Sequence, residues 1–175
     1  MTDGKNGKGA MTVGKTEFII KPGTQEIFSI HVFDAPRELV FKAMTDPNVI
    51  PKWWGPRDHW TKVDKMDVRP GGKWRFINGD SSGNEYGFNG FFHLIDPPQR
   101  YVQTYEFEGM QGHVGLVSMT LEEVDGKTKL VEQSLFPSVA DRDAVVQSGM
   151  EKGAAETMER LAELLAELLK DKHAG

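Results

Sequence analysis

The clearest hydrophobic pattern in the chain runs from about residue 141 to residue 170. Apolar residues recur there at intervals of three and four, and Glu, Lys and Arg occupy most positions between them. This spacing predicts one helix of roughly 45 Å with a single apolar stripe, which needs a large apolar partner. The stripe consists of Val146, Met150, Ala154, Met158, Leu161, Leu165 and Leu168.

Between residues 60 and 136 the pattern changes to that of β-strands. The expected strands are 61–69, 73–78, 85–95, 100–108 and 112–136. Asp125-Gly126 is a strong hairpin signal, so it divides the last segment into two strands. Short turns join the segments, which predicts an antiparallel meander.

The N-terminal part adds one or two strands and two short helices. A strand is expected at 26–33, after a short edge strand at 16–20. Asp34-Ala35-Pro36 predicts a helix start with Asp34 near the N-cap, and Thr45-Asp46-Pro47 opens a second, short helix that ends near Trp53.

The fold class is therefore α+β. A curved antiparallel sheet of about six or seven strands wraps around the long C-terminal helix, with two short helices after the first strand. We expect residues 1–15 to form a flexible leader, because they lack an apolar segment, and residues 16–172 to form one domain.

Composition narrows the function classes. The net charge of −5 and the isoelectric point near 5.6 disfavour a nucleic-acid surface. No apolar run approaches the ~20 residues of a membrane span. The absence of cysteine excludes disulfides and thiolate chemistry and agrees with a cytoplasmic location.

Aromatic residues form the second prominent feature. Nine of the 17 aromatic residues lie between Trp74 and Phe107, interleaved with glycines, and alternation places many of them on shared strand faces. They form either a packed core or the wall of an apolar cavity. Gly149 and Gly153 lie one turn apart on the expected helix and favour open space beside it, for a strand or for a ligand.

Trp53 and Trp54 stand next to each other before Gly55-Pro56. Adjacent helical residues point about 100° apart, so both indoles cannot face the same pocket. We expect Trp54 to be the more buried one and to close one end of the cavity, with Trp53 partly exposed.

Few residues suggest catalysis. His113 is the best single candidate for a base or hydrogen-bond donor, although such a histidine is more often a structural strand residue. No metal-binding spacing, Gly-x-Ser-x-Gly motif or phosphate loop occurs, so no catalytic residue, metal or cofactor is predicted. The carboxylates near the sheet and helix are expected to face outward or to form helical ion pairs: Glu85, Glu106, Glu122, Glu132 and Glu156.

Several motifs together resemble the bacterial branch of the SRPBCC (START-like) superfamily that is grouped with the activator of the 90-kDa heat-shock protein ATPase. They are Pro22-Gly23-Thr24-Gln25-Glu26, Phe33-Asp34-Ala35-Pro36-Arg37, Trp53-Trp54-Gly55-Pro56, Asp67-Val68-Arg69-Pro70-Gly71-Gly72, Gly79 to Gly90, Phe136-Pro137-Ser138 and Ser148-Gly149-Met150-Glu151-Lys152-Gly153. The resemblance covers about residues 16–169. It implies a helix-grip fold with a cavity between the long helix and the sheet.

The leading hypothesis is a protein that binds an apolar or aromatic small molecule in that cavity. The alternatives are an enzyme of cyclase or hydrolase type on the same scaffold, and a co-chaperone-like interaction module, for which the family name suggests contact with a chaperone. We expect a cavity of a few hundred Å³, with His113 or a tyrosine hydroxyl as its polar group. The expected pocket residues are Trp54, Trp74, Phe76, Tyr86, Phe88, Tyr105, His113, Met119, Met150, Gly153 and Met158.

Overall fold

In the computed structural model, which describes residues 12–175, the strands form one antiparallel sheet of eight strands. The expected leader, residues 1–15, therefore lies mostly outside the described residues. The strand order is β1-β2-β8-β7-β6-β5-β4-β3. The strands are β1 (Glu17–Ile19), β2 (Glu26–Phe33), β3 (Trp60–Met66), β4 (Lys73–Gly79), β5 (Glu85–Asp96), β6 (Arg100–Phe107), β7 (Gly115–Val124) and β8 (Lys127–Leu135).

The α+β fold and the meander from β3 to β8 are confirmed. The sheet has more strands than the expected six or seven, because the short edge segment is a true strand that pairs with β2. The β7–β8 hairpin turns at Asp125 and Gly126, whose φ angles of 52° and 75° are those that a tight two-residue hairpin turn requires.

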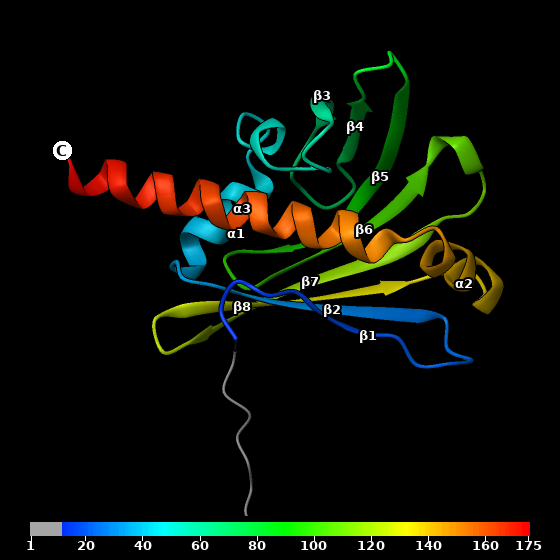
Figure 1. The fold of residues 1–175 in the computed structure, drawn as a ribbon, viewed down its shortest axis with the longest axis horizontal. Coiled ribbons are helices and arrows are strands. Elements are labelled where there is room, and N and C mark those ends of the chain that lie inside the picture. Colours follow the sequence, from blue (N-terminus) through cyan, green and yellow to red (C-terminus); the bar gives the residue numbers. More distant parts are fainter. Residues whose placement is uncertain (1–11) are drawn as a thin grey trace, which may run out of the picture.

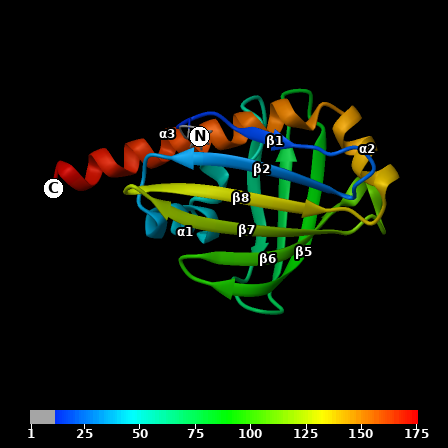
Figure 2. The ribbon, with the colours of Figure 1, turned by 90° about the horizontal axis from the view of Figure 1, so that it is seen from below.

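The sheet is strongly curved. In Figure 1, β3, β4 and β5 stand upright, whereas β6, β7, β8, β2 and β1 run across the view beneath α3 (Met150–His173). Figure 2 shows the same turn from below. The pairing register shifts between Val63 and Lys65 in β3 and between Phe92 and Leu94 in β5. Such irregularities bend strands and increase their twist, so they help to give the sheet its concave face.

The first two helices are shorter than the sequence suggests. Helix α1 (Arg37–Thr45) has Pro36, not Asp34, at its N-cap. The second helix is only a 3₁₀ turn, η1 (Ile50–Lys52), which ends at the tandem tryptophans.

The expected single helix over 141–170 is wrong in one respect, because it is two helices. Helix α2 (Val139–Gln147) ends at Ser148, and α3 begins after Gly149. Gly149 has a φ angle of 78°, in the left-handed region that glycine adopts without strain. The backbone N–H groups of Ser148 and Gly149 donate to Ala144 and Val146, as at a helix end that glycine terminates. Gly149 is therefore a helix terminator and not a space-making residue inside a helix.

The apolar stripe of α3 packs on the concave face, as expected. Met158, Leu161 and Leu165 are buried, and Leu161 has no exposed surface. They belong to one core with residues of α1 such as Val40, and with Trp53. This packed region lies along the middle of α3, whereas the first turns of the helix face a cavity.

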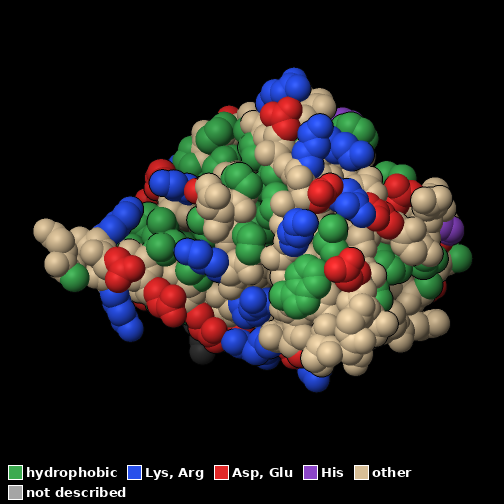
Figure 3. All heavy atoms as spheres, turned by 90° about the horizontal axis from the view of Figure 1, so that it is seen from above, with side chains coloured by type: hydrophobic (Ala, Val, Ile, Leu, Met, Phe, Trp, Pro, Cys, Tyr) green, Lys and Arg blue, Asp and Glu red, His purple; other side chains and the backbone are tan. Residues whose placement is uncertain are grey.

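The outer surface carries charges of both signs. The face shown in Figure 3 mixes Lys and Arg with Asp and Glu rather than presenting a continuous basic area. No helix among residues 12–175 is long and apolar enough to span a membrane.

Candidate functional site

A cavity of about 620 Å³ lies between the concave face of the sheet, α2 and the first turns of α3. Strands β4 to β8 supply its floor, and the loop that contains Trp54, Gly55 and Pro56 covers one side. Exposed lining residues such as Met110 and Ala144 place its opening beside α2, at the ends of β6 and β7.

Ten of the eleven residues expected at the pocket line this cavity: Trp54, Trp74, Phe76, Phe88, Tyr105, His113, Met119, Met150, Gly153 and Met158. Tyr86 does not. It pairs with Asn78 and so lies on the expected face of β5, but His59 covers it with a ring-to-ring distance of 6.0 Å. Alternation gives the face of a strand correctly, but not how far along that face a cavity extends.

The aromatic wall is held together by ring contacts. Trp54 meets Phe76 and Phe88 edge to face, with ring centroids 5.2 and 5.3 Å apart. Trp74 lies 4.9 Å from Phe76, and its indole N–H donates to the carbonyl of Thr104 at 3.2 Å. Each such pair adds about 0.5–1.5 kcal/mol beyond area burial, so the ring contacts help to stabilise the wall.

The expected burial order of the tandem tryptophans is wrong. Trp53 is the buried one, with 3% exposure, and its indole donates to the carbonyl of Ala43 at 3.0 Å. Trp54 is only half-buried, because its ring faces the open space of the cavity. The two indoles do point in different directions: the Trp53 ring lies in the core, and the Trp54 ring lines the cavity.

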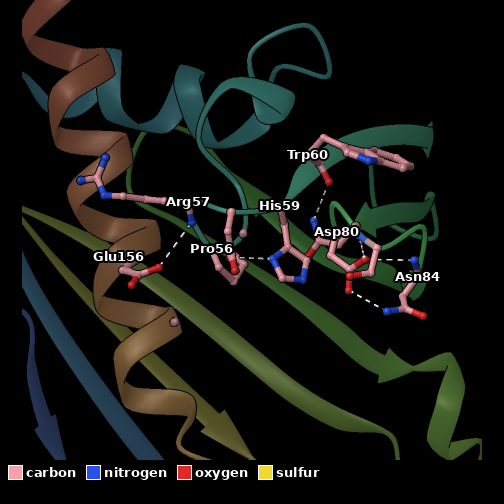
Figure 4. Close-up of polar contacts among 12 residues, drawn as sticks. Pro56, Arg57, His59, Trp60, Asp80, Asn84 and Glu156 are labelled. Atoms are coloured by element: carbon pink, nitrogen blue, oxygen red, sulfur yellow. Dashed lines mark hydrogen bonds and ion pairs between the residues drawn. The ribbon is translucent and has the colours of Figure 1, made fainter.

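The loop after Trp54 is fastened to α3. Arg160 donates to the carbonyls of Gly55 and Pro56 at 2.8 and 3.0 Å. Figure 4 shows the backbone N–H of Arg57 directed at the Glu156 carboxylate, 3.3 Å away. The Arg57 guanidinium also donates to Glu163 on the same helix. Glu156 was expected to pair along its own helix, but it holds the loop instead.

Glu132 is the functional candidate that sequence reasoning missed. It was expected to face outward, but it lines the cavity. Its register neighbours are Ser29 on β2 and Met119 on β7, and its carboxylate accepts a hydrogen bond from Ser134 Oγ at 3.1 Å. Burial raises the pKa of Glu132 above its usual range. Glu132 lies two residues after buried Leu130 on β8, and residues two apart share a strand face, so this spacing is the sequence signal that places Glu132 inward.

Two tyrosines share this part of the cavity. Tyr101 and Tyr105 both line it. Burial, and to a lesser degree the negative charge of Glu132, raise the pKa of both phenols, so both stay protonated at neutral pH. They are available as hydrogen-bonding groups but not as bases.

His113 stands at the opening. Its Nδ1 lies 2.8 Å from Asp141 Oδ1, and its side chain is about half exposed. Asp141 is in the first turn of α2, where its backbone N–H donates to the N-cap Ser138 Oγ at 3.0 Å. The pair therefore links the loop before β7 to α2, and His113 is a residue of the opening rather than of the interior.

The lining of the cavity includes acidic side chains. Among the described residues that line the cavity there is no Lys or Arg, whereas Glu132 and Asp141 are carboxylates. Within residues 12–175, no three His, Asp or Glu side chains gather as metal ligands. The interior is thus apolar and aromatic, with a polar strip around Glu132.

A family model described as Activator of Hsp90 ATPase homolog 1-like protein matches residues 34–166. The chain belongs to this family. The resemblance drawn from the sequence motifs is therefore confirmed.

Solved structures of other members of this fold agree with the architecture. Protein Ms6760 from Mycobacterium smegmatis is 24% identical, with a TM-score of 0.78 over 86% of this chain and 96% of that one. A protein from Rhodobacter sphaeroides is 25% identical, with a TM-score of 0.80 over 87% and 98%. The AHSA1 protein from Silicibacter pomeroyi is 21% identical, with a TM-score of 0.68 over 81% and 97%. The comparison with curated proteins found no match.

Proposed function

We propose that this protein binds an apolar, largely aromatic small molecule in the cavity between α2, α3 and the sheet. The observation that carries the proposal is the size of the cavity, about 620 Å³, next to a wall of aromatic rings. Protein cores are close-packed and contain few voids larger than a water molecule. Ligand sites, in contrast, occupy about 300–1,000 Å³ and are mostly apolar with a few polar groups.

The chemistry of the lining supports binding over catalysis. His113, the best candidate for a general base, lies at the opening of the cavity and is paired with Asp141. Methionines Met119, Met150 and Met158 line the cavity, and their flexible side chains let an apolar site adapt to a guest. Contact with a chaperone, which the family name suggests, and a cytoplasmic location stay predictions for this chain.

A fluorescent probe tests the proposal directly. N-phenyl-1-naphthylamine is uncharged at neutral pH and brightens in apolar sites, so its emission is followed during titration with the protein. We expect saturable binding with one site per chain. The variant Ala154→Phe places a ring into the lining of the cavity and is expected to weaken binding at least about tenfold, or ~1.4 kcal/mol.

The matched control is Ala166→Phe, on the exposed side of the same helix. It should bind the probe as the wild type does. If the wild type shows no saturable change, or if Ala154→Phe binds unchanged, the aromatic residues are a core and not a ligand site. The interaction-module hypothesis would then rank first.

A further inference from the structure

Glu132 lies in the cavity, and within residues 12–175 its carboxylate has no positively charged partner. Strands β2, β7 and β6 present Ser29, Met119, Tyr101 and Tyr105 to the cavity, and the first turns of α3 present Met150, Gly153, Ala154, Thr157 and Met158. None of these carries a positive charge. The nearest polar contact is the hydroxyl of Ser134 at 3.1 Å. His113 and Asp141, at the opening, already pair with each other.

An ionised carboxylate in this position is partly shielded from solvent and has no Lys or Arg beside it among the described lining residues, which is energetically unfavourable. The protein itself does not supply a counter-ion there, since none of the described lining residues is Lys or Arg. A guest that brings its own positive charge supplies the missing partner. A guest that brings a carboxylate places a second negative charge into the cavity, where the attraction of a cation is absent.

The aromatic wall suits the same guest. Trp54, Trp74, Phe76 and Phe88 line the cavity together with Glu132. The faces of aromatic rings attract cations, and tryptophan does so most strongly. An aromatic wall and one half-buried carboxylate together match an apolar amine.

We propose that the ligand is an apolar or aromatic amine whose protonated nitrogen pairs with the Glu132 carboxylate. This inference rests on the proposed ligand-binding function and names its ligand class. Fatty acids and aromatic carboxylates are accordingly poor ligands. Burial raises the pKa of Glu132 in the empty cavity, so binding of the ammonium group stabilises the ionised carboxylate and releases a proton to solvent wherever the empty form holds one.

Three probes of equal shape separate the possibilities: 9-anthracenemethylamine, 9-anthracenemethanol and anthracene-9-carboxylate. Binding of each is followed by energy transfer from the protein's tryptophans to the anthracene. The wild type should bind the amine at least about tenfold more tightly than the alcohol, and the carboxylate most weakly. The amine's advantage should shrink as the pH falls through the pKa of Glu132, because the carboxylate then takes up a proton.

The variant Glu132→Gln keeps the shape of the side chain but removes its charge. It should bind amine and alcohol within about threefold of each other, with the alcohol's affinity close to that of the wild type. The control Glu122→Gln removes one negative charge from a surface ion pair with Lys129 on neighbouring strands and should keep the amine preference.

The outcomes are distinct. If no probe binds the wild type, the proposed function itself fails. If the alcohol binds as tightly as the amine, the cavity binds ligands but the amine inference is overturned. If Glu132→Gln retains the amine preference, the carboxylate is not the partner. Should Glu132→Gln fail to fold, the carboxylate probe decides: if it binds the wild type as tightly as the amine does, the proposal is overturned.

Discussion

Two glycines four residues apart should respond to the same substitution with opposite signs. Gly149 separates α2 from α3, whereas Gly153 lies inside α3. Replacing each with alanine adds one methyl group in both cases. The structure therefore predicts the outcome from backbone conformation and surroundings alone.

The magnitude for Gly149 follows from its φ angle of 78°. A Cβ there would meet nothing within 4 Å, so the effect is conformational and not steric. A residue with a Cβ in the left-handed region costs about 1–2 kcal/mol. Gly149→Ala should destabilise the fold by about that amount, and Gly149→Asn by less, because asparagine tolerates this region better.

Gly153 has helical backbone, and a Cβ there would lie 3.8 Å from Pro56 Cγ, an ordinary contact distance. Alanine in a helix interior is favoured over glycine by about 0.5–1 kcal/mol, so Gly153→Ala should stabilise the fold by that amount.

Urea unfolding followed by far-ultraviolet circular dichroism measures both changes. In thermal unfolding, each kcal/mol corresponds to about 2–4 °C for a domain of this size. The reasoning is refuted if Gly153→Ala loses stability or if Gly149→Ala gains it. A loss at Gly153 would mean that the glycine is needed for open space beside the helix, which is what the sequence alone suggests.

Two further predictions concern the interior. Leu161→Ala should destabilise the fold by about 2–5 kcal/mol, because Leu161 has no exposed surface. Leu116→Ala, at a side chain with 39% exposure, should lose well under half as much stability. Equal losses in urea unfolding would contradict the placement of Leu161 in the core. Because the pKa of Glu132 is raised, the folded state holds this proton to higher pH than the unfolded state does. The free energy of unfolding of the wild type, relative to that of Glu132→Gln, should therefore fall as the pH rises above the unfolded pKa of about 4.5. The slope is at most ~1.4 kcal/mol per pH unit, and the difference levels off above the folded pKa. A difference that is independent of pH would show that Glu132 is not buried.

Much of the fold was accessible from periodicity, because strands with one buried face alternate regularly. Strand β2 occupies the expected residues 26–33, and the Asp125-Gly126 turn is where its backbone requirement predicts. The helix break was not accessible from the stripe, because Val146 and Met150 continue the spacing across it. The dipeptide Ser148-Gly149 was the better signal, since glycine commonly follows a helix end.

The candidate site was only partly accessible. Alternation along the strands identifies the aromatic wall. For Glu132, its charge favours the outer face, whereas its position two residues after Leu130 favours the inner face, and the structure has it on the inner face. For Trp53 and Trp54, the sequence shows that the two rings diverge but not which one meets α1. That choice depends on how η1 is oriented against Ala43, which is a tertiary contact.

The sheet order also has a consequence for synthesis on the ribosome. Strand β2 is made early, but its long partner is β8, and Glu26 pairs with Leu135. At about 5–20 residues per second, the nascent β2 waits roughly 5–20 s for that partner. During this interval Ile27, Val32 and Phe33, all buried in the finished protein, have no sheet to join. The cavity forms later still, because α3 follows β8 in the chain and its first turns line the cavity, so a ligand can bind only after α3 has been made.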